Sequence, residues 1–159
     1  NIRWEPSREE TLLFLDEQKI NLRVWGGGWE RTKNKHHPLF SDAPHLVGDD
    51  YAKALCGAKI NLCLLSQWFG DQTTARSVEI PACGKFLLAE RNSEHESLFR
   101  EGIEAEFYES PDEMLEKIKY YLRHEEKREQ IASAGYQRCV EHYSNKTILE
   151  RLLGRLLEP

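Results

Sequence analysis

The stretch INLCLLSQWFGDQTTARSVEIPACG, residues 60–84, decides the fold that this sequence predicts. Residues 60–65 are an almost continuous apolar run, which is typical of a strand buried on both faces of a parallel sheet. A polar loop follows, and residues 76–82 then have the composition of a short helix that ends at Gly84. A buried strand followed by a loop and a helix is the repeating unit of a doubly wound α/β sheet.

Short apolar runs and helical segments alternate on both sides of this unit. The strands are expected at residues 2–4, 22–25, 45–47, 60–65, 86–89 and 106–108. The pattern therefore predicts an α/β fold with a Rossmann-like, three-layer, doubly wound parallel sheet of about six strands. Such sheets bind ligands at the carboxyl ends of their strands, so the loops of interest follow Trp4, Trp25, Val47, Leu65 and Ala89.

Capping residues mark several helix starts. The segment Ser110-Pro111-Asp112-Glu113 combines an N-cap, a proline in the first position and a capping-box glutamate, the strongest helix start in the chain. A serine followed three residues later by glutamate also predicts helix starts at Ser7 and Ser93. The helices expected from about residue 111 to 158 have an apolar face, and we expect them to be scaffold.

Length and charge limit the possible functions. The 159 residues suit one domain, expected to span the whole chain, and an opening Asn1 in place of Met suggests a piece of a longer protein. The formal net charge is −5 and no basic stripe is present, so no nucleic-acid partner is expected. No apolar run approaches the ~20 residues needed to cross a bilayer, so no membrane span is expected.

Cysteine usage favours a reducing compartment. The chain has four cysteines, and none belongs to a Cys-x-x-Cys pair or lies at metal-ligand spacing from a histidine. We interpret them as buried free thiols of a cytoplasmic protein. They are Cys56, Cys63, Cys83 and Cys139.

The loop and helix after the central strand hold the candidate binding residues. Thr73 or Thr74 is expected to cap the helix, leaving backbone N–H groups that favour phosphate. Arg76 places a cation in the first turn, where the helix dipole disfavours it unless an anion such as a diphosphate lies nearby. Glu79 follows on the same face, and its carboxylate could accept both hydroxyls of a ribose. The alternative is an ion pair between Arg76 and Glu79 on a solvated face.

Other functional classes fit less well. Gly26-Gly27-Gly28 is a poor dinucleotide fingerprint, because the third glycine of G-x-G-x-x-G would fall at Arg31. A phospho-receiver domain would need an acidic residue at the end of a later strand, and the central strand ends in Leu65-Ser66. A non-catalytic Rossmann-like module that binds a nucleotide or a sugar stays open as the alternative to an enzyme.

Several short motifs in order resemble one family. Asp71 and Glu79 are spaced like the acidic-x7-Glu signature of GT-B glycosyltransferases. The motifs T-x-R-x-x-E-I-P-A-C-G, M-L-E-K-I-K-Y-Y-L and A-S-A-G-Y more closely resemble the spore maturation protein CgeB-like glycosyltransferases of group 1. The opening W-E-P-S-R-E, then V-W-G-G-G-W and V-G-D-D-Y-A-K-A-L, fit the same family, so the resemblance covers nearly the whole chain.

The resemblance assigns roles to the residues around the predicted helix start. It implies that Glu79 holds the ribose of a nucleoside diphosphate sugar and that Arg76 and the Thr73 and Thr74 amides lie near the diphosphate or sugar. Asp71 matches the first acidic position, which contacts the donor sugar in the wider superfamily and is aspartate here instead of glutamate. Asp71 and Arg76 are therefore the candidate catalytic residues, and the others are candidate donor-binding residues.

The resemblance also places two candidate residues elsewhere. Arg8 lies where relatives often have a phosphate-binding cation, and Gly48 lies at a loop that usually approaches the base. The implied protein is the C-terminal, donor-binding half of a hexosyltransferase-like enzyme whose N-terminal acceptor domain is absent from this chain. On this reading the fragment alone is inactive. No metal or other cofactor is expected, because the sequence has no Asp-x-Asp motif.

Overall fold

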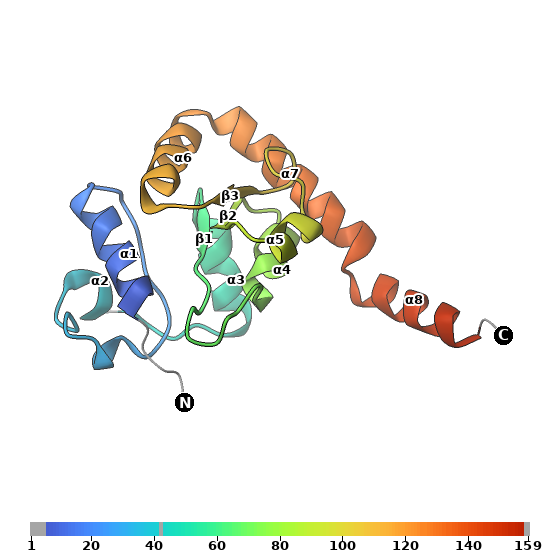
Figure 1. Ribbon diagram of the computed structural model, residues 1–159, viewed down its shortest axis with the longest axis horizontal. Coiled ribbons are helices and arrows are strands. Elements are labelled where there is room, and N and C mark those ends of the chain that lie inside the picture. The colour runs from blue at the N-terminus through green and yellow to red at the C-terminus, as the bar shows by residue number, and fades with distance from the viewer. Residues whose placement is uncertain (1–5, 42, 158–159) are drawn as a thin grey trace. The chain divides into compact units, whose positions relative to one another are not determined.

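The computed structural model describes residues 6–41 and 43–157 (Figure 1). The chain divides into two compact units, which are described separately. The N-terminal unit comprises Asn1–Ala54 and Ser66–Asp71, and the C-terminal unit comprises Leu55–Leu65 and Gln72–Pro159.

A parallel sheet forms the centre of the C-terminal unit. Its strands are β1 (Asn61–Cys63), β2 (Leu87–Glu90) and β3 (Glu106–Tyr108), in the order β1-β2-β3. Both pairs are parallel, and Ala89 is the register partner of Cys63 on one side and of Phe107 on the other. The predicted parallel α/β architecture is therefore confirmed, with strands at three of the predicted places.

The expected number of about six strands is wrong for the part of the chain that the structure describes. Residues 22–25 and 45–47 form no strand, and residues 2–4 lie outside the described residues. The Gly26 N–H donates to the Pro44 carbonyl at 3.0 Å, but this bond does not extend into a ladder. These apolar runs lack the regular exchange of backbone hydrogen bonds that defines a strand.

Helices surround the sheet of the C-terminal unit (Figure 1). In this unit α4 packs on β1, β2 and α7, whereas α6 packs on β3 and α7. Their bounds are α4 Ala75–Ala82, α5 Ser93–Leu98, α6 Pro111–Arg123, α7 Glu125–His142 and α8 Asn145–Leu157.

The predicted helix starts are confirmed in part, because α1 (Pro6–Glu17) begins at Pro6 and Ser7 therefore lies inside that helix instead of capping it. Ser110 caps α6 by accepting a hydrogen bond from the Glu113 N–H at 3.2 Å, as its sequence pattern predicts. The cap of α5 differs, because Asn92 instead of Ser93 accepts the N–H of His95, at 2.9 Å. Asparagine is as good an N-cap as serine, so the helix begins one residue earlier than the serine pattern indicated.

The N-terminal unit contains α1 (Pro6–Glu17), the 3₁₀ turn η1 (Trp29–Arg31) and α2 (Pro38–Ser41), and most of α3 (Gly48–Gly57). The Trp29 ring stacks on the Phe40 ring at a centroid distance of 4.7 Å and an interplanar angle of 12°. This stack joins η1 to α2 and gives Trp29 a packing role within its own unit.

The four cysteines are free, as expected, but not all are buried. Cys63 and Cys139 are buried, whereas Cys56 is exposed and Cys83 is half-buried. Cys56 lies in the last turn of α3, so an apolar sequence context did not place its side chain in the core. Among the described residues, no helix is long and apolar enough to cross a membrane.

Candidate functional site

The N-terminus of α4 holds four of the predicted site residues. Thr74 is the N-cap residue, with extended backbone angles φ −138° and ψ 171°, as the sequence predicted. Arg76 lies half-buried in the first turn, and Glu79 is exposed one turn later, while Thr73 is exposed just before the cap. The segment thus presents a cation and the start of a helix together, an arrangement that suits an anionic ligand.

The other predicted site residues belong to the N-terminal unit. Asp71 is half-buried, and its N–H donates to the Ser66 carbonyl at 3.0 Å. Arg8 is half-buried in α1, and Gly48 begins α3 with a φ of +56°, a conformation that glycine adopts without strain. The predicted site residues on α4 and next to its cap therefore lie together in the C-terminal unit.

A group that the sequence interpretation did not single out lies against this helix start. We call Cys63, Thr74, Ser77 and His95 the Cys63–His95 cluster. The Cys63 sulfur lies 3.5 Å from the Thr74 hydroxyl and 3.7 Å from the Ser77 hydroxyl. The Ser77 hydroxyl lies 2.8 Å from His95 Nε2. Because Cys63 ends β1, these contacts place the start of α4 at the carboxyl end of that strand, where ligands bind in such sheets.

The contacts of the cluster fix the proton positions on His95. Nδ1 lies 2.6 Å from the Glu90 carbonyl oxygen, which accepts hydrogen bonds only, so Nδ1 carries the proton. In the neutral ring Nε2 is then an acceptor, and the Ser77 hydroxyl donates to it. The Ser77 oxygen in turn accepts the Thr74 N–H at 3.1 Å, so that amide is already bonded.

Charge coupling within the cluster shifts two pKa values. Burial raises the pKa of the Cys63 thiol, but hydrogen bonds with the imidazole and the two hydroxyls outweigh burial and hold the pKa below its usual value. Burial lowers the pKa of the His95 imidazole, but hydrogen bonds with the Cys63 sulfur and the Glu90 carbonyl leave it above its usual value. The thiol and the imidazole therefore favour each other's charged forms.

One sequence signal could have revealed this cluster. The loop after Ala89 was among those expected at the ligand-binding edge, and it leads directly to Asn92 and His95. A histidine one turn into a helix at that edge is a candidate in its own right. The sequence pattern did not indicate the hydrogen-bond partner of His95, because Ser77 is 18 positions away in sequence.

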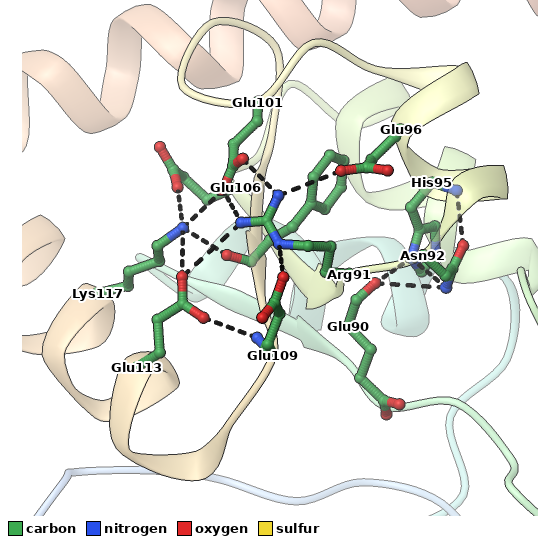
Figure 2. Close-up of polar contacts among 11 residues, drawn as sticks. Glu90, Arg91, Asn92, His95, Glu96, Glu101, Glu106, Glu109, Glu113 and Lys117 are labelled. Atoms are coloured by element: carbon green, nitrogen blue, oxygen red, sulfur yellow. Dashed lines mark hydrogen bonds and ion pairs between the residues drawn. The ribbon is translucent and has the colours of Figure 1, made fainter.

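A second polar group ties β3, α6 and the loop after β2 together (Figure 2). Arg91 donates to both carboxylate oxygens of Glu101 at 2.6 Å, and Lys117 donates to Glu101 and Glu106, each at 2.8 Å. Hydrogen bonds from Arg91 lower the pKa of Glu101 to about 2. We call this the Arg91–Lys117 network; it also includes Glu96, Glu109 and Glu113.

The Arg91–Lys117 network is best explained as structural. Both cations already have several carboxylate partners, so neither offers an open charge to a phosphate. Among the described residues, no group of three or more His, Cys, Asp or Glu side chains is placed to hold a metal ion.

The chain is thus an α/β domain of the parallel-sheet class, and the cation and helix start at the carboxyl edge of its sheet suit phosphate-containing ligands. Comparison with known families narrows this class. A family model described as glycosyl transferase-like matches residues 8–154, so the chain belongs to that family. Among curated protein sequences, none matches the chain.

The solved structures show the same fold. The chain is similar to Anabaena Alr3699/HepE, whose crystal structure was determined in complex with UDP-glucose, with a TM-score of 0.63 and 14% sequence identity. The match covers 80% of this chain and 35% of the HepE chain, so the chain spans well under half the length of that protein. The expected fold, that of one half of a GT-B glycosyltransferase, is confirmed, with three strands in the described residues.

Proposed function

We propose that this chain binds a nucleoside diphosphate sugar, the donor for glycosyl transfer, at the N-terminus of α4. The observation that supports this most is the grouping of Thr73, Thr74, Arg76 and Glu79 on one helix start at the carboxyl edge of the sheet, in a member of the glycosyl transferase-like family. HepE, with a similar fold, was crystallised with UDP-glucose, a ligand of the proposed class.

Each residue has a distinct role in this proposal. The amides at the start of α4 and the guanidinium of Arg76 neutralise the diphosphate, because a helix N-terminus and an arginine fork both suit phosphate oxygens. We therefore propose that no metal is needed there. Glu79, one turn further, accepts the ribose hydroxyls. Asp71 contacts the transferred sugar and acts with Arg76 in catalysis, while Arg8 supports the phosphates and Gly48 approaches the base.

Replacing Glu79 by glutamine is expected to weaken nucleotide binding by roughly 1–3 kcal/mol, the scale for losing a charged hydrogen bond. The measurement is calorimetric titration of the wild-type chain and the variant with UDP and with GDP. Glu116→Gln is a matched control, since Glu116 is also an exposed helical glutamate but lies on α6. The nucleotide affinity of this variant should equal that of the wild type. Unchanged affinity of Glu79→Gln for a nucleotide that binds the wild type would refute the ribose assignment.

We further propose that transfer needs a second domain, which binds the acceptor and forms the facing wall of the donor cleft. HepE is much longer than its matched region, which supports this. Reactive geometry requires donor and acceptor to be held together, and an open donor site admits water. The 159-residue chain should therefore bind a nucleotide sugar weakly and transfer no sugar to a panel of acceptors. The full-length protein should transfer the sugar to one of these acceptors. Efficient transfer by the chain alone would contradict the two-domain proposal.

The apolar face of α8 supports the same proposal. Leu152 and Leu156 have 52% and 78% of their surface exposed, and Leu149 and Leu153 are also more than half exposed. A continuous exposed leucine face is typical of an interaction surface. We propose that the N-terminal domain of the whole protein covers it.

Two narrower assignments belong to the same proposal. The short motifs quoted above support a place among the CgeB-like glycosyltransferases, with a hexose as the transferred sugar. The free cysteines support a reducing cytoplasm as the location.

A further inference from the structure

We propose that His95 is a positioning residue for the diphosphate: through Ser77 it holds the start of α4 in its phosphate-binding conformation. The inference rests on the proposed function, and it adds a specific role for a side chain from the loop after β2. It predicts that His95 sets the affinity for the phosphates and leaves the affinity for the nucleoside unchanged.

The His95 ring is fixed from several sides. It is fully buried, and its Nδ1 donates to the Glu90 carbonyl at 2.6 Å. Its backbone N–H donates to the Asn92 side chain at 2.9 Å (Figure 2). The ring also stacks on Phe107 of β3, at a centroid distance of 5.8 Å and an interplanar angle of 6°. Because β2, β3 and the α5 cap all hold the ring, the position of Nε2 is set by the sheet.

The same ring reaches the start of α4. Nε2 lies 2.8 Å from the Ser77 hydroxyl, and the oxygen of that hydroxyl accepts the Thr74 N–H at 3.1 Å. The Thr74 N–H is thus already hydrogen-bonded within the protein. The next two amides, of Ala75 and Arg76, are the N–H groups that a helix leaves without an internal partner, and they are available to a ligand.

Packing alone does not account for this arrangement. Ser77 and His95 are both fully buried, and a buried hydroxyl and imidazole cost free energy that an apolar pair of the same volume would avoid. When the imidazole is neutral, the hydroxyl donates its one proton to Nε2, so the orientation of its oxygen toward the Thr74 amide is fixed. A leucine at position 95 would fill the space but would leave this hydroxyl free to rotate.

The test compares ligands with and without phosphates. The wild-type chain and the variants His95→Leu, His95→Gln and Ser77→Ala are titrated by NMR with UDP and uridine, and with GDP and guanosine. His95→Leu and Ser77→Ala should each weaken binding of the diphosphate about tenfold, the effect of one lost hydrogen bond of about 1.4 kcal/mol, with nucleoside affinity unchanged. His95→Gln, whose amide oxygen can accept from Ser77, should restore binding to within about threefold of the wild type.

The outcomes separate this inference from the proposed function. If neither UDP nor GDP binds the wild type, the proposed function fails and this inference fails with it. If a diphosphate binds the wild type and binds the folded His95→Leu and Ser77→Ala variants equally well, only the inference is overturned. An equal loss for diphosphate and nucleoside would also overturn it, since general loosening of the fold affects both. Ser77→Ala removes one atom, so it keeps the test valid if His95→Leu fails to fold.

Discussion

Replacing Lys117 by methionine is expected to destabilise the C-terminal unit by about 3 kcal/mol, among the largest effects of any single substitution in this chain. Lys117 donates to Glu106 at 2.8 Å, and the Glu106 side chain is 7% exposed. Methionine keeps the length of the side chain but removes the charge, so Glu106 becomes a buried carboxylate without its cation. Urea denaturation followed by circular dichroism measures the change.

Lys119→Met is the matched control for this experiment. Lys119 lies on the same helix two residues later, but it is exposed, so its loss should change the free energy of unfolding by less than about 0.5 kcal/mol. The Tyr121 hydroxyl also donates to Glu106, at 2.6 Å, and the Lys117 substitution leaves this donor in place. Equal stability of the two variants would contradict a structural role for the Arg91–Lys117 network.

The substitution Gly135→Ala should destabilise the unit by roughly 2–3 kcal/mol, the upper part of the range for overpacking a tight core. An alanine Cβ at this position of α7 would overlap the backbone carbonyl oxygen of Glu104 and lie 3.4 Å from Pro81 of α4. Neither neighbour is a flexible side chain, so α7 would have to move away from both. Thermal and urea unfolding of the variant measure this effect.

Gly154→Ala provides the opposite case. Gly154 is also inside a helix, α8, and an added Cβ would meet nothing within 4 Å. There alanine should stabilise the helix by up to about 1 kcal/mol, because it restricts the unfolded chain. If both glycine variants changed stability in the same direction and by the same amount, the close packing of α7 on the Glu104 backbone would be contradicted.

Local sequence signals predicted the parts of the fold that depend on local interactions. Caps at Thr74 and Ser110 and the buried run around β1 were found where the pattern placed them. The runs at 22–25 and 45–47 are also mostly apolar, yet they form no strand, because a strand requires a partner that apolar content does not specify. The same limit explains why the number of strands was overestimated.

The candidate site divides in the same way. Thr73, Arg76 and Glu79 were predicted together because they lie within two helical turns of one another. His95 was missed because its contact with Ser77 depends on strands lying side by side, with Cys63 in register with Ala89. Sequence spacing alone does not give that pairing, so the structure was needed to connect the loop after β2 with the start of α4.

The most direct test of the central claim is an NMR titration of the chain with UDP and GDP, with the backbone amide resonances assigned. The account predicts that one of these nucleotides causes saturable shifts concentrated at Thr74, Ala75, Arg76 and Glu79, with smaller shifts at His95. NAD should cause none of these shifts, since the chain lacks a dinucleotide fingerprint. Saturable shifts confined to other parts of the chain, or no saturation with either nucleotide, would contradict a donor site at the N-terminus of α4.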